Sequence, residues 1–102
     1  MSFFRKLFGL QPAPDLKELV KNGALIIDVR SQAEFKGGHV KGAKCIPLDR
    51  ISNEANRFKK ETPIVLCCAS GARSGAASRM LKSKGFTAYN AGSWTSLRNK
   101  IS

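Results

Sequence analysis

The apolar positions of the chain fall into short runs separated by amphipathic stretches. Two continuous runs that are rich in β-branched residues, 24–27 and 63–67, are typical of strands buried on both faces. Shorter runs at 43–47 and 87–89 predict two further strands. Because strands alternate with helical patterns, the sequence predicts an α/β fold with a mostly parallel sheet and helices on both faces.

Helix start and stop signals lie before and between these strands. Asp15 with Glu18, and Ser31 with Glu34, have the spacing of capping boxes, and glycines follow each of these two segments. Gly85 lies just past the end of a third helical pattern. Helices are therefore expected at 15–21, from 31 to the glycines at 37–38, at 52–60 with a largely exposed surface, at 74–84 and at 94–100.

Residues 1–14 form a separate segment that ends in the run QPAP. Its large apolar side chains would share one face of a short helix: Phe3, Phe4, Leu7 and Phe8. Two roles stay open, a peptide that binds a membrane surface or a partner, and an arm that packs on its own domain or frays. The apolar stretch after Lys6 is too short for a signal peptide. We expect an N-terminal arm over 1–14 and one domain over 15–102.

Charge narrows the possible partners. The 102 residues include 18 Lys and Arg against 7 Asp and Glu, a formal net charge of +11. Such an excess suits nucleic acid, an anionic membrane surface or a small anionic substrate. The basic residues are spread from Arg5 to Lys100 without a nucleic-acid-reading motif, so we expect no nucleic-acid partner. We also expect no transmembrane segment, because no apolar run approaches the ~20 residues that a membrane span needs.

Three cysteines, Cys45, Cys67 and Cys68, lack the number and spacing of a disulfide framework or a structural zinc site. We therefore expect reduced thiols and a cytoplasmic location. Strand alternation puts Cys67 and Cys68 on opposite faces of the sheet. Cys45 and Cys67 are expected to be small core residues. Cys68 is the candidate nucleophile, because it ends the strongest strand just before a small-residue loop and a helix.

The loop after Cys68 has the features of an anion-binding site. Its small residues allow backbone N–H groups to turn inward, and Gly71 permits unusual backbone dihedrals. A helix N-terminus and the Arg73 cation would each favour the thiolate, and together they should lower the pKa of Cys68 by about one to two units. The expected substrate-binding residues are Ala69, Ser70, Gly71, Ala72 and Arg73.

Several short motifs follow one another along residues 15–98: DVR at 28–30, EF at 34–35, GHVKGA at 38–43, IPL at 46–48, VLCCASGARS at 65–74, KGF at 84–86 and AGSW at 91–94. Together they resemble the rhodanese family, specifically its small single-domain members. The resemblance implies a rhodanese-like, three-layer domain whose central, mostly parallel sheet has four or five strands. Four residues separate Cys68 from Arg73, as in the sulfurtransferases of this family. Related phosphatases and arsenate reductases have a loop one residue longer.

The resemblance implies a sulfurtransferase that works through a persulfide on Cys68. Sulfane sulfur would pass from a small anionic donor such as thiosulfate to Cys68, and then to an acceptor thiol or to cyanide. Residues 69–73 would cradle the persulfide, with Arg73 holding the loop or the donor, and no metal or organic cofactor would be needed. A module that carries sulfur or binds a partner without useful turnover is the alternative, and the oligomeric state stays open.

Other residues of chemical interest are expected to be structural. Asp28 and Arg30 should form a charge pair or cap at the end of the first strand. His39, the one histidine of the chain, should make a hydrogen bond within a turn. Trp94 and Phe86 should belong to the core.

Overall fold

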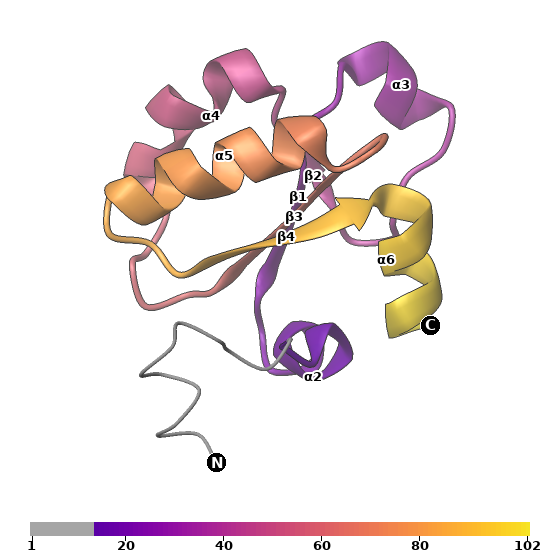
Figure 1. Cartoon of the computed structure of the whole chain (residues 1–102), viewed down its shortest axis with the longest axis horizontal. Coiled ribbons are helices and arrows are strands. Elements are labelled where there is room, and N and C mark those ends of the chain that lie inside the picture. Colours follow the sequence, from indigo (N-terminus) through magenta and orange to yellow (C-terminus); the bar gives the residue numbers. More distant parts are fainter. Residues whose placement is uncertain (1–13) are drawn as a thin grey trace.

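A computed structural model describes residues 14–102 of the protein (Figure 1). The elements, in chain order, are α2 (Leu16–Lys21), β1 (Leu25–Asp28), α3 (Gln32–Lys36), β2 (Lys44–Cys45), α4 (Leu48–Glu54), the 3₁₀ turn η1 (Ala55–Arg57), β3 (Ile64–Cys68), α5 (Ala72–Ser83), β4 (Ala88–Ser93) and α6 (Trp94–Ile101). The arm expected over residues 1–14 lies outside the described residues, apart from Pro14.

The described strands form one parallel sheet in the order β2-β1-β3-β4. Helices α4 and α5 lie on one face of this sheet, and α2 and α6 lie on the other (Figure 1). The predicted α/β, three-layer architecture is confirmed, and within residues 14–102 the sheet has four strands rather than five. Parallel strands share one carboxyl-terminal edge, which is where ligands bind in such sheets.

The central strand β3 is buried along its whole length, as its continuous apolar run predicts. Leu66 and Cys68 belong to the core layer beneath α4 and α5, whereas Val65 and Cys67 belong to the layer beneath α2 and α6. Strand alternation therefore places the two neighbouring cysteines on opposite faces, as predicted.

The region after β2 differs most from the predicted pattern. The helix expected over 52–60 begins at residue 48, directly after Pro47, and ends in a 3₁₀ turn at residue 57. Residues 52–60 are largely exposed, as expected, with Ala55 the one buried residue among them, whereas Ile51, just before this range, is buried against the sheet. The strand expected over 43–47 is only Lys44–Cys45, because this edge strand pairs with β1 alone.

The elements around the predicted site have somewhat different bounds. Strand β3 is Ile64–Cys68 and ends at Cys68 as expected, whereas α5 begins at Ala72 rather than at residue 74. The earlier helix start follows from Gly71, whose φ of 104° reverses the chain within a single residue. Strand β4 runs on to Ser93 because a register shift beside Cys68 extends its pairing with β3.

A buried ion pair closes the carboxyl-terminal end of β1. Arg30 Nη2 lies 2.7 Å from Asp28 Oδ2 and donates a second hydrogen bond of 2.7 Å to the Gly38 carbonyl. The Arg30 guanidinium also lies 4.9 Å from the centre of the Trp94 ring. The pair is structural, as predicted, because it ties β1 to the segment after α3 and to α6.

The predictions for the other aromatic and imidazole groups also hold. His39 Nδ1 lies 2.8 Å from the Phe35 carbonyl, so its ring makes the expected hydrogen bond within a turn. Phe86 is buried in the layer beneath α4 and α5, and half-buried Trp94 packs on the opposite layer.

Candidate active site

The predicted nucleophile lies at the centre of the carboxyl-terminal edge of the sheet. Cys68 is the last residue of β3, residues 69–71 form the loop, and α5 begins at once with Ala72. Ala69, Ser70 and Ala72 are exposed, whereas the Cys68 residue is only 1% exposed. The strand, loop and helix are thus joined as the sequence predicted, and the loop shields a thiol that ends a buried strand.

Hydrogen-bond donors surround the Cys68 sulfur. The Gly71 N–H donates to Sγ over 3.0 Å, and the Ser74 N–H reaches Sγ at 3.4 Å. The Ser74 hydroxyl oxygen lies 3.3 Å from the same sulfur. This arrangement depends on Gly71, because its left-handed conformation turns the amide inward at the N-terminus of a 12-residue helix.

These donors lower the pKa of the Cys68 thiol. Burial opposes ionisation of the thiol, but hydrogen bonds from the Ser74 hydroxyl and from the N–H groups of Ser74, Gly71 and Ser70 outweigh it, so the pKa of Cys68 lies below its ordinary value. The direction is the one expected from the sequence. The leading favourable cause is direct hydrogen bonding rather than the Arg73 cation.

Arg73 is oriented toward a carboxylate rather than toward the sulfur. Its guanidinium donates two hydrogen bonds to Glu34, at 2.8 Å to Oε1 and 3.0 Å to Oε2. Glu34 also completes the capping box of α3 with Ser31. The Arg73 hydrogen bond, followed by that from the Ser31 backbone, holds the pKa of Glu34 at about 2. Of the two roles predicted for Arg73, this geometry favours holding the loop, which it ties to α3.

Two residues of the site were absent from the predicted set. Ser74 is fully buried beneath the loop, and Asn90 reaches the loop from β4. Asn90 Nδ2 donates to the Gly71 carbonyl over 3.0 Å, and its Oδ1 lies 2.7 Å from the Ser74 hydroxyl oxygen. The position of Ser74 in the first turn of the helix was a usable signal. Asn90 carries no such signal, because only the β3–β4 pairing brings it to the loop.

The other thiols lie in different surroundings. Burial, followed by the charge of Asp28, raises the pKa of Cys67 to about 12. Burial also raises the pKa of Cys45, whose Sγ lies 3.6 Å from the Arg30 carbonyl. Neither thiol therefore has the environment of a thiolate at neutral pH.

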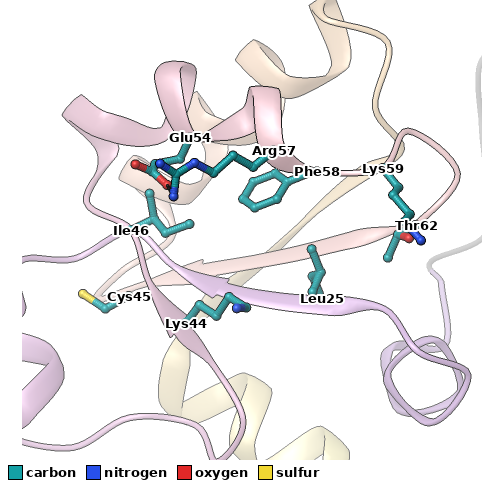
Figure 2. Close-up of a pocket in the computed structure, with 9 residues that line it drawn as sticks. All are labelled: Leu25, Lys44, Cys45, Ile46, Glu54, Arg57, Phe58, Lys59 and Thr62. Carbon is teal, nitrogen blue, oxygen red and sulfur yellow. Dashed lines mark ion pairs between the residues drawn. The ribbon is translucent and has the colours of Figure 1, made fainter.

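The protein surface also has hollows near these thiols. Figure 2 shows one of about 660 Å³ between β2 and the η1 segment, with Cys45 at one end and its sulfur turned away from the hollow. None of its lining residues belongs to the loop. A second hollow, of about 420 Å³, is lined by Arg73 together with Val29, Pro47 and Leu48, and so lies beside the loop.

Within residues 14–102 no three His, Cys, Asp or Glu side chains gather as metal ligands would. No helix in this part of the chain is long and apolar enough to cross a membrane.

The family model for the Rhodanese-like domain matches residues 12–100. The chain therefore belongs to the rhodanese-like family, as the motif series predicted. A solved structure agrees, since the human single-domain sulfurtransferase TSTD1 superposes with a TM-score of 0.71 at 27% identity, covering 87% of this chain and 94% of that one.

Curated relatives of the chain include both enzymes and carriers of sulfur. The thiosulfate sulfurtransferase GlpE of Pseudomonas fluorescens is 28% identical over 85% of this chain and 76% of its own length. Two Bacillus subtilis proteins align over shorter stretches. The uncharacterized protein YqhL is 41% identical over 63% of this chain, and the putative sulfur carrier protein YrkF is 38% identical over 60%. The aligned part spans 51% of YqhL and 33% of YrkF.

Proposed function

We propose that the protein is a sulfurtransferase that moves a sulfane sulfur through a persulfide on Cys68. The observation that carries this proposal is the Cys68 sulfur itself, which lies within 3.0 Å of one backbone N–H at the N-terminus of α5. A buried thiol with several convergent donors is poised to form an anion, and a thiolate is the nucleophile that attacks sulfur. GlpE and TSTD1, which are similar to the chain, support the class of reaction.

The reaction has two displacement steps with no net oxidation. The Cys68 thiolate attacks the outer sulfur of thiosulfate, so a new S–S bond forms while the bond to the sulfite group breaks. Sulfite leaves with the electron pair of that bond, and Cys68 holds a persulfide. An acceptor thiolate then attacks the outer sulfur of this persulfide, which yields an acceptor persulfide and regenerates the thiolate. Cyanide as acceptor would yield thiocyanate.

The residues of the loop have different roles in this reaction. The N–H groups of Gly71 and Ser74 stabilise the attacking thiolate and, with the other amides of the loop, would cradle the negative charge of the persulfide. Arg73 holds the loop against Glu34 and contributes a positive charge at its rim. The exposed residues Ala69, Ser70 and Ala72 carry no charge, so the fixed amides and the positive field of the protein would attract an anionic donor.

The test is sulfur loading followed by discharge. The protein is reduced, incubated with thiosulfate, separated from it by gel filtration and weighed by intact mass spectrometry. We expect one added sulfur that cyanide removes as thiocyanate, and no such addition to Cys68→Ser. The proposal fails if wild type gains no sulfur, or if Cys68→Ser gains it equally. Cys45→Ser is the matched control, and it should load as wild type does.

The second candidate function is a sulfur carrier or partner-binding module, and the similarity to the putative sulfur carrier YrkF favours it. Both functions require the Cys68 persulfide, but they differ in turnover. A carrier would load once and release sulfur slowly to cyanide or small thiols, whereas the enzyme would produce thiocyanate over many cycles. Measuring the steady-state rate of thiocyanate formation per Cys68 separates them. We propose a cytoplasmic location for either function, because each needs a reduced Cys68.

A further inference from the structure

The side chain of Asn90 joins three separate parts of the site. Its Nδ2 donates to the Gly71 carbonyl over 3.0 Å, and its Oδ1 accepts the Gly92 N–H at 2.9 Å. The same Oδ1 lies 2.7 Å from the hydroxyl oxygen of Ser74. A single amide on β4 therefore fixes the residue that turns the loop and the residue beneath the sulfur.

Glycine residues leave room for the Asn90 amide. A Cβ atom built on Gly75 would lie 3.2 Å from Asn90 Nδ2, and one built on Gly71 would lie 3.2 Å from the Cα of Gly92. Glycine in the interior of α5 weakens the helix, because it gains more backbone freedom than alanine on unfolding. The close approach of the Asn90 amide is a physical reason for glycine at position 75.

The Ser74 hydroxyl has one proton and two acceptors within reach. While Cys68 is a neutral thiol, the S–H can donate to the Ser74 oxygen, 3.3 Å away, and the hydroxyl proton points to Asn90 Oδ1. When the thiol ionises, the hydroxyl proton can turn to the sulfur, because a charged acceptor is the stronger one. Asn90 Oδ1 still accepts the Gly92 N–H in that state, so the change leaves no oxygen without a partner.

We propose that Asn90 is the positioning residue of the sulfur site: through the Gly71 carbonyl its amide holds the turn from which the Gly71 N–H donates to Cys68, and its Oδ1 accepts the Ser74 hydroxyl proton while the thiol is neutral. This inference rests on the proposed function only where it concerns catalysis. The hydrogen bonds that connect Asn90 to the surroundings of Cys68 are the same whichever reaction the thiol performs. Arg73 pairs with Glu34, and Asp28 pairs with Arg30. The hydrogen bonds of Asn90 go to none of these charged groups, so its effect on the sulfur passes through Gly71 and Ser74.

The test is the pH dependence of Cys68 alkylation by iodoacetamide, measured in the whole chain by peptide mass spectrometry. Without the amide the turn at Gly71 and its N–H donor loosen, so in Asn90→Ala the midpoint should rise by about one pH unit. The matched control is Asn53→Ala, which removes an exposed amide of α4 outside the loop and should leave the midpoint unchanged. An unchanged midpoint in Asn90→Ala would overturn the proposal. A lower midpoint would also overturn it, because Asn90 would then withhold the Ser74 hydroxyl from the sulfur rather than position it.

A second variant keeps the amide and displaces it. Gly75→Ala should raise the helix propensity of α5, yet its methyl group would lie 3.2 Å from Asn90 Nδ2, so the amide must shift by a few tenths of an ångström. We expect the alkylation midpoint to rise in this variant while the unfolding temperature does not fall; an unchanged midpoint here would count against Asn90. Alkylation needs no sulfur donor, so this outcome stays distinguishable from failure of the sulfur-transfer proposal. Thiosulfate could fail to load sulfur onto wild type while the alkylation midpoints shift as expected. Asn90 would then still position the Cys68 thiolate, and that thiolate would serve a function other than sulfur transfer.

Discussion

Cys67 and Cys68 are adjacent in the same strand, and both are almost fully buried, at 0% and 1% exposure. Cys67 lies in the apolar layer beneath α2 and α6, where burial and then the charge of Asp28 raise its pKa to about 12. Cys68 lies on the other face, where hydrogen bonds outweigh burial and lower its pKa. The shifts have opposite signs although the two side chains are equally hidden from water.

Burial alone therefore does not set the direction of the pKa shift of a cysteine. Desolvation disfavours both thiolates, as it does for any buried acid. The two sulfur atoms differ in their hydrogen-bond donors. Gly71 and Ser74 donate to the sulfur of Cys68, whereas the neighbours of Cys67 are mostly aliphatic. A change of one position along a strand is therefore enough to reverse the direction of the pKa shift of a buried thiol.

The largest expected effect is on catalysis. Cys68→Ser should abolish sulfur transfer from thiosulfate to cyanide, because a serine hydroxyl cannot form a persulfide. Cys67→Ala should keep most of the activity and lose about 1 kcal/mol of stability from a small cavity. Thiocyanate formation and urea unfolding measure the two effects. Equal loss of activity in both variants would remove the distinction between the two cysteines.

The next largest effect concerns the ion pair that lies beside Cys67 at the end of β1. Arg30→Met leaves the buried Asp28 carboxylate without its cationic partner, with only the backbone N–H of residue 30 still donating to Oδ1, which should lower the free energy of unfolding by about 3–5 kcal/mol. Arg50→Met is the matched control, because Arg50 pairs with Glu54 on the exposed surface. That variant should cost at most about 1 kcal/mol. Urea unfolding would contradict this view of the pair if the two variants lost similar stability.

A smaller effect is expected from Gly71→Ala, compared with Gly23→Ala. The two glycines have nearly the same φ, 104° and 102°, so each alanine should cost about 1–3 kcal/mol of backbone strain. Only the Cβ at position 71 also meets a neighbour, the Gly92 Cα at 3.2 Å, whereas the one at position 23 meets nothing within 4 Å. Gly71→Ala should therefore be the less stable variant in thermal unfolding.

The same pair of variants tests the chemistry of the loop. Gly71→Ala disturbs the amide that donates to Cys68, so the alkylation midpoint of Cys68 should rise in this variant. In Gly23→Ala the midpoint should stay at the wild-type value, because position 23 lies far from the loop in the turn after α2. A shift of equal size in both would mean that general strain, and not the loop amide, governs the thiol.

The smallest effect is a dependence of stability on acid pH. The folded pKa of Glu34, about 2, lies below its ordinary 4.5 because Arg73 and then the Ser31 backbone bind the carboxylate. A carboxylate with a lowered folded pKa stabilises the fold above its unfolded pKa and loses that contribution as the pH falls through the folded value. Wild type should therefore lose more thermal stability than Glu34→Gln between pH 4.5 and 2. Glu61→Gln, which changes an exposed carboxylate, should follow wild type, and identical curves for all three would contradict the role of the Arg73 pair.

The sequence predicted the layers of the fold and the position of Cys68 between the end of a strand and a loop of small residues, because both depend on local patterns. The apolar run of β3, the loop of small residues and the helix start all lie within residues 63–74. It did not predict the partner of Arg73, which lies 39 positions away in α3, nor the contact of Asn90 with Gly71, 19 positions away. Such contacts depend on the order and register of the strands, which a single sequence does not specify.

The predicted start of α4 is also wrong. The apolar residues Leu48, Ile51 and Ala55 face the sheet at helical spacing, but the predicted helix began at residue 52 and so left out the first two of them. For Cys68, the sequence predicted that Arg73 and the helix N-terminus would lower the pKa of the thiol, whereas in the structure hydrogen bonds from Ser74 and backbone amides are the main lowering causes.

The most direct test of the account compares the two cysteines within the wild-type protein. Reduced protein is treated with iodoacetamide at a series of pH values, and tandem mass spectrometry assigns the label to position 67 or 68. We predict that Cys68 is alkylated with a midpoint below that of an ordinary thiol, about 8.5, while Cys67 stays unlabelled in the folded protein at every pH at which Cys68 reacts. Labelling of Cys67 first, or one common pH profile for both thiols, would contradict the claim that the loop donors make Cys68 the nucleophile.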